Sequence, residues 1–302
     1  MLPCFRRTET AHGRDPVLRG TTGPMLPAPA AAADADPLSQ VFVDAALAAA
    51  GAGVVHDLPG VGRNLHDHPL CGVVHEASRP IPAGRTNHAE TSMSWRSDDS
   101  LPGPDTQLMF IHVPFHPPHL SAPPNSFTLA VAAVPEARGS VRLAGPDPAT
   151  PPLIDPGYLS AEPDVRRTVQ GLRVAREIAA TAPFAPWRAR EVPPGPGVQG
   201  EAALRSHLAR GTSTYCHPVG SCAMGTGPEA VVDVDLRVRG IGGLRVADAS
   251  IMPRIVSVNT NAATITIGEE AADLIRRPDR PAAARRAPAE PPLHEGRTGA
   301  VR

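Results

Sequence analysis

The stretch "DVDLRVRGIGGLRVADASIMPRIVSVNTNAATITIGEEAADLI", residues 233–275, decides how the chain is interpreted. Within it, "LRVADASIMP" is typical of a strand that runs into a loop. The apolar spacing of "NAATITIGEEAADLIRR" predicts a helix from about Asn261 to Arg277. Asn261 is a favourable residue for capping the start of such a helix. The stretch therefore predicts a strand, a loop and a helix start in succession.

The segment "STYCHPVGSCAMG", residues 213–225, precedes this stretch and allows three interpretations. A zinc site is disfavoured, because the spacing of Cys216, His217 and Cys222 lacks the paired ligand clusters of structural zinc sites. A redox pair is disfavoured because nothing nearby would lower a thiol pKa, so buried, inert cysteines are expected. The third interpretation is a general base at His217, since the ordinary histidine pKa of about 6.5 lies near working pH.

The remainder of the chain predicts an α+β fold, with strands gathered in the first half and helices later. The apolar pattern and the flanking turn residues predict helices over residues 36–53, 160–182 and 201–210, strands over 71–76 and 105–115, and a hairpin over 126–143. Residues 54–70 are expected to form a short strand followed by a Gly/Pro loop. Ser160 is expected to cap the second helix. A parallel β-α-β dinucleotide-binding unit, with a G-x-G-x-x-G fingerprint joining its first strand to its helix, is not evident in the sequence.

Composition narrows the function classes. The chain has 302 residues, a formal net charge of -1 and only 3% aromatic residues, with 37 Pro and 27 Gly. This balance disfavours nucleic-acid and membrane-surface partners. The sequence contains no apolar run near the roughly 20 residues of a membrane helix. It also lacks an apolar signal-peptide stretch, so a cytoplasmic location is expected.

Several motifs, taken together, identify a family resemblance. The stretch 233–275, with "HPVGSCAMG" before it, resembles the C-terminal region of the glucose–methanol–choline (GMC) family of FAD-dependent oxidoreductases. "DLPGVGRNLHDHP", residues 57–69, and "GSVRLAGPDPATPPLIDPGYLS", residues 139–160, are similar to further family segments in the correct order. The resemblance implies a GMC substrate domain over residues 54–277, in which helices flank a β-sheet and some elements face the flavin.

The flanking regions are expected to differ from a complete family member. Residues 1–53 resemble a remnant of the FAD-binding domain, partly loop, and the Pro-, Ala- and Arg-rich residues 278–302 predict a disordered tail. The resemblance thus suggests a truncated, internally deleted member. An alternative is a catalytically inactive fragment that binds no flavin by itself. A third interpretation is a subunit that a separate chain carrying the FAD domain completes.

The resemblance also implies a chemistry and its residues. A small-molecule alcohol CH–OH would be oxidised to a carbonyl by hydride transfer to FAD, with His217 as catalytic base and Asn259 as its partner at the substrate oxygen. Asp248, Ala249, Thr260 and Asn261 would contact the cofactor. From the residues alone, Asn261 equally fits an ordinary N-cap and Asp248 an Asx turn. In the loop at 64–68, Asp67 is expected to orient a histidine or backbone amides, and no metal ligands are expected.

Overall fold

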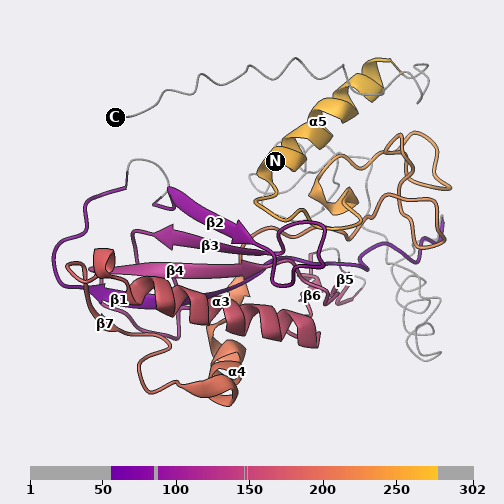
Figure 1. Cartoon of the computed structure of the whole chain (residues 1–302). Helices are drawn as coiled ribbons and strands as arrows, with labels where there is room; N and C mark the ends of the chain where they lie inside the picture. The colour runs from indigo at the N-terminus through magenta and orange to yellow at the C-terminus, as the bar shows by residue number, and fades with distance from the viewer. Residues whose placement is uncertain (1–55, 85–87, 146, 148, 278–302) are drawn as a thin grey trace, which may run out of the picture.

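The computed structural model describes residues 56–84, 88–145, 147 and 149–277, and these residues form an α+β fold (Figure 1). Its main sheet is antiparallel, with strand order β2-β3-β4-β1-β7 and β8 paired to β1. The strands of this sheet are β1 (Pro69–Ala77), β2 (Thr91–Trp95), β3 (Thr106–Ile111), β4 (Ser126–Ala133), β7 (Arg188–Glu191) and β8 (Ser213–Thr214). A separate two-stranded sheet pairs β5 (Ser140–Arg142) with β6 (Leu153–Asp155).

Helices α3 (Glu162–Ala180) and α4 (Gly200–Gly211) build a core against this sheet. Strand β4 is buried along its whole length, as expected of a central strand. Leu172 and Leu208 from the two helices pack into one cluster with Leu129 and Val131 of β4. At Gly171 an added Cβ would lie only 2.3 Å from Val131 Cγ1, so a glycine is needed for α3 to approach the sheet this closely.

The region from residue 219 onward is mostly loop and ends in α5 (Asn261–Arg276). A second apolar cluster, which includes Val231, Val232, Ile251 and Leu274, holds α5 to these loops. The short 3-10 helix η1 (Ala182–Phe184) follows α3, and η2 (Ala249–Ile251) lies before α5 and packs against it. Figure 1 shows α5 on the upper side of the molecule, whereas α4 lies below the main sheet.

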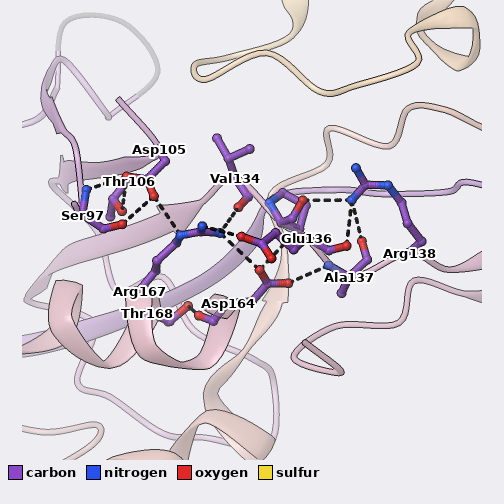
Figure 2. Close-up of polar contacts among 11 residues, drawn as sticks. Ser97, Asp105, Thr106, Val134, Glu136, Ala137, Arg138, Asp164, Arg167 and Thr168 are labelled. Atoms are coloured by element: carbon purple, nitrogen blue, oxygen red, sulfur yellow. Dashed lines mark hydrogen bonds and ion pairs between the residues drawn. The ribbon is translucent and has the colours of Figure 1, made fainter. Parts of the chain in front are cut away.

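An ion-pair network fixes the start of α3 to the segment after β4 (Figure 2). Arg167 binds Asp105 at 2.8 Å and Glu136 at 2.6 Å. The fully buried Asp164 accepts hydrogen bonds from the backbone N–H of Glu136 at 2.8 Å and of Ala137 at 3.0 Å. The carboxylate therefore satisfies two backbone donors that the sheet leaves unpaired.

Most predicted elements are present, and four details of the sequence analysis are wrong. The expected hairpin over 126–143 does not form, because β5 pairs with β6 rather than with β4. The expected strand at 244–253 is an isolated bridge at Arg245 followed by η2. Ser160 does not cap α3, whose N-cap is Ala161. Asn261 is the first residue of α5 and not its cap.

Several expectations lie wholly or partly outside the described residues. These are the remnant assigned to 1–53 with its helix at 36–53, the start of the short strand expected at the beginning of 54–70, and the tail at 278–302. Among the helices of the described part, none has the length and apolar character required to span a bilayer.

Candidate active site

Two loops that are distant in sequence lie side by side and form the candidate site. The segment before β1 pairs with the segment after β8 through an antiparallel bridge between His66 and Val219. Strand pairing of β1 with β8 and a bond from the Tyr215 amide to the His68 carbonyl at 3.2 Å continue this contact. The backbone therefore brings the 64–68 loop and the 213–220 segment together.

Asp67 is the anchor of this junction. Its side chain is buried, and its Oδ1 accepts the backbone N–H of His217 at 2.9 Å. Its Oδ2 accepts the hydroxyl of Tyr158 at 2.5 Å and the hydroxyl of Thr214. The expectation that Asp67 orients a backbone amide is confirmed. Burial and the bond to Asp67 raise the pKa of Tyr158, so this phenol remains a donor.

His66 has a structural role, as its two ring bonds show. The Ile255 N–H donates to His66 Nε2 at 2.9 Å, so this nitrogen is the acceptor. Its Nδ1–H consequently donates to the Asn64 carbonyl at 2.6 Å. The ring thus joins the 64–68 loop to the segment before Asn259.

His68 and His217 contact each other, and their bonds fix both tautomers. His68 Nε2 lies 3.0 Å from the Val256 carbonyl, which can only accept, so Nε2 carries the proton. In the neutral ring His68 Nδ1 is then an acceptor, and it lies 3.1 Å from His217 Nδ1. His217 must donate from Nδ1, which leaves its Nε2 with a free lone pair.

The pKa shifts support neutral rings at this site. Burial, followed by the neighbouring His217, lowers the pKa of His68 to about 4. Burial also lowers the pKa of His217, although the nearby Asp67 carboxylate acts in the opposite direction. At pH 7 both imidazoles are therefore neutral, with one protonated and one basic nitrogen each, the state that a general base requires.

Asn259 reaches His217 through Tyr215. The exposed Asn259 donates from Nδ2 to the Tyr215 hydroxyl at 2.9 Å. The ring centroid of Tyr215 lies 4.0 Å from that of His217. The Tyr215 hydroxyl also contacts Met109 Sδ of β3, which ties the group to the main sheet. The two residues predicted as catalytic thus belong to one contact chain whose middle member, Tyr215, the sequence analysis did not identify.

The four predicted cofactor residues lie near the start of α5. Thr260 is buried and Asn261 exposed, and no side chain caps the first turn of this helix. Asp248 is exposed and its Oδ1 accepts the Ser250 amide at 2.8 Å, which is the Asx-type turn left open by the sequence. Ala249 begins η2, which packs against α5.

The cysteines differ from expectation at one position. Cys216 is exposed rather than buried, and its φ of 61° lies in the left-handed region. Cys222 is half-buried and burial raises the pKa of its thiol, which fits the predicted inert cysteine. Cys71 is buried in β1, where burial raises its pKa to about 12. Within the described ranges, His, Cys, Asp and Glu side chains form no group of three that could hold a metal ion.

Comparison with known proteins defines the class to which this site belongs. Residues 135–268 match the family model described as GMC oxidoreductase, and this part of the chain belongs to that family as its C-terminal domain. The chain is 39% identical over 248 residues to choline oxidase of Arthrobacter globiformis, covering 79% of this chain and 45% of the relative. It is 34% identical over 271 residues to an alcohol dehydrogenase [acceptor] of Pseudomonas putida, covering 80% and 48%.

Solved structures agree with this assignment. Pyridoxine 4-oxidase from Mesorbium loti superposes with a TM-score of 0.70 at 34% identity, covering 77% of this chain and 47% of that one. A formate oxidase shares the fold with a TM-score of 0.67 at 24% identity, covering 78% of this chain and 50% of that one. The chain therefore spans about half the length of the relatives it matches.

Proposed function

We propose that this chain supplies the substrate side of an FAD-dependent oxidoreductase that converts a small-molecule alcohol to a carbonyl, with residues 54–277 as its substrate domain. The main observation behind this proposal is the 3.1 Å contact between His68 Nδ1 and His217 Nδ1. Because His217 donates from Nδ1 in this contact, its Nε2 is free to take a hydroxyl proton. The relatives support the substrate class, because choline and simple alcohols each carry a CH–OH group.

The residues at the start of α5 fit the proposed cofactor. The first turn of this 16-residue helix has no side-chain cap, so its backbone N–H groups and positive dipole end are available to an electron-rich ring edge. Thr260 and Asn261 would hold this edge, with Asp248 and Ala249 contacting another part of FAD. When bound, FAD would supply the hydride acceptor.

The chain's own residues divide the remaining work. His217 Nε2 would receive the hydroxyl proton, while Asp67 fixes the backbone position of His217 through its amide. Asn259 is exposed beside Tyr215 and would orient the substrate oxygen through its amide group. Tyr215 packs against His217 and would form a wall of the substrate site.

A second candidate is a chain that binds no flavin alone, and one observation favours it. The one G-x-G-x-x-G spacing in the sequence, GPGVQG at 195–200, follows the antiparallel edge strand β7 and does not belong to the parallel β-α-β unit that seats the ADP half of a dinucleotide. In this alternative the fold is retained without activity, or a separate chain that carries the FAD-binding domain completes the site.

Flavin retention separates the candidates. The full chain is purified with added FAD, desalted, and its visible spectrum is recorded. A flavin band near one equivalent supports the first candidate, and its absence supports the second.

Replacement of His217 tests the proposed base in a flavin-loaded preparation. His217→Gln should retain the flavin band but lower alcohol turnover at least about a hundredfold, because general-base catalysis contributes that much or more. The exposed His119→Gln serves as the matched control and should keep full turnover. Unchanged turnover in His217→Gln would refute the role of this imidazole.

A further inference from the structure

A second cavity, distinct from the candidate active site, lies against α4. Its volume is about 480 Å³, which is within the usual size of small-molecule pockets. Its walls come from α4, from the segment around Leu120 and from residues 192–194 after β7. His68, Tyr215, His217 and Asn259 do not line it.

One face of α4 supplies the polar side of this cavity. Ala203, Ser206, His207 and Arg210 all line it and follow the spacing of a single helix face. The opposite face carries Leu204 and Leu208, which are buried in the core beneath the main sheet. Because the core fixes the helix, the position of these polar side chains is fixed as well.

His207 lines this cavity, but its Nε2 is buried against the end of α4. Its Nε2 is inaccessible to solvent and has no hydrogen-bond partner among the described residues. The ring packs against the end of α4, where a Cβ added at Gly211 would lie 2.4 Å from Nε2. This nitrogen therefore does not contact a ligand in the cavity, and the polar contacts of the cavity come from other side chains.

The charges around the cavity are unbalanced toward positive. Its lining contains Arg210 but no aspartate or glutamate. Glu191 is the carboxylate close enough to influence His207, and Arg176 holds it with two bonds, at 2.6 Å and 3.0 Å. Among the described residues, no carboxylate lies within 4.0 Å of the Arg210 guanidinium. The cavity therefore offers one cationic donor, Arg210, with no counter-ion from the described part of the chain.

Apart from Ser121, the remaining walls are aliphatic. Leu120, Val192, Pro194 and Val198 line the cavity opposite the polar face of α4. We propose that this cavity binds a small organic carboxylate with a short aliphatic chain, whose carboxylate contacts Arg210 and whose chain packs on these apolar walls. Charge-assisted bonds to a guanidinium select a carboxylate over a neutral or cationic head group.

Three probes with the same six-carbon chain test the head group. Hexanoate, hexan-1-ol and hexylammonium are each titrated into the full chain, and binding is followed through backbone amide shifts by NMR. Hexanoate is expected to shift α4 residues in a saturable way and to bind at least about fivefold more tightly than the other two. Equal binding of hexan-1-ol or hexylammonium would overturn the proposal, as would no saturable shift with hexanoate.

Three variants locate the site. Arg210→Ala should weaken hexanoate binding at least about fivefold through loss of the charged donor, and Ala203→Phe should do so by filling the cavity. Arg166→Ala, an exposed arginine on α3, is the matched control and should bind normally. Since Arg210 is exposed, its removal should leave the fold intact, and circular dichroism verifies this for each variant. Unchanged binding by Arg210→Ala would place the ligand elsewhere and refute the proposal.

Discussion

His68 makes no contact with a reacting atom in the proposed reaction, yet each of its ring nitrogens has a defined partner. Nε2–H donates to the Val256 carbonyl at 3.0 Å and Nδ1 faces His217 Nδ1 at 3.1 Å. This makes His68 a positioning residue, because it determines which nitrogen of His217 is basic. A histidine tautomer set by the partner of its other nitrogen is a common device in catalytic and metal sites.

Substitution of His68 by phenylalanine tests this positioning role. Without the acceptor at Nδ1, the neutral His217 ring should shift its proton largely to Nε2, the preference of free imidazole side chains. Long-range ¹H–¹⁵N NMR at pH 7.5 distinguishes the two tautomers directly. Turnover of a flavin-loaded preparation should fall at least about tenfold with little change in KM, since the base is lost but the substrate contacts remain.

A matched histidine provides the control for this experiment. His119→Phe removes an exposed histidine and should leave the His217 tautomer unchanged. Retention of a protonated Nδ1 in His68→Phe would show that another group sets the tautomer.

The candidate site also shows how far residue patterns can predict chemistry. His217 and Asn259 follow from motif resemblance, and the binding role of Asp67 was anticipated from its loop. The contact between His68 and His217 joins residues 149 positions apart, so no local pattern indicates it. Tyr215 was missed for the same reason, because its partners Met109 and Asn259 lie on other elements.

At the scale of elements, the start of α3 depends on a carboxylate without solvent contact. Asp164 is fully buried and satisfies two backbone donors, while Arg167 lies 3.5 Å away within the same network (Figure 2). Asp164→Ala should lower the free energy of unfolding by about 3 kcal/mol, because it leaves two backbone donors unpaired in a buried position and removes one of the three carboxylates around Arg167. Urea denaturation of the full chain measures this change.

Arg166 is the control for this prediction. It lies two positions further along α3, and its pair with Glu162 is exposed on both sides. Arg166→Ala should therefore change the free energy of unfolding by less than about 0.5 kcal/mol. An equal decrease in the free energy of unfolding in Asp164→Ala and Arg166→Ala would show that burial of the ion-pair network does not contribute to stability.

The elements that sequence could predict are those with an unambiguous apolar period. Helices α3, α4 and α5 were anticipated to within a few residues, as were β1 and β3. The sequence analysis does not predict β2 (TSMSW), which has only two apolar residues, or β7 (RARE), which is short and mostly charged. The predicted hairpin over 126–143 is wrong because it paired β5 with the strand that precedes it in the sequence, β4. The partner of β5 is instead β6, at residues 153–155.

At the scale of the whole molecule, the histidines share one direction of pKa shift. Burial lowers the pKa of all five shifted histidines: His66, His68, His75, His207 and His217. Each has a folded-state pKa below the unfolded value of about 6.5, so the folded state binds fewer protons. The stability that these groups contribute is fully present above pH 6.5 and is lost as the pH falls.

We therefore predict that the chain loses stability between pH 7 and pH 5, before most carboxylates titrate. For His68, with a folded pKa of about 4, the loss approaches about 3 kcal/mol at the acidic limit. Urea unfolding curves at pH 8, 7, 6 and 5 measure the decline. A free energy of unfolding that stays constant over this range would contradict the prediction.

His75 allows the predicted pH dependence of stability to be tested at a single position. Replacing its ring breaks no hydrogen bond within the described residues. It is buried, both ring nitrogens have no partner in the described part of the chain, and the ring stacks on Phe127 with centroids 5.5 Å apart. Glu191, Arg188 and Arg176 are the charged groups near it. His75→Phe should preserve the stack on Phe127 and remove one titratable group that is neutral in the folded state. The free energy of unfolding should therefore fall less between pH 7 and pH 5 in this variant than in the unsubstituted chain. An unchanged slope in this variant, with normal stability at pH 8, would show that protonation of His75 does not contribute to acid unfolding.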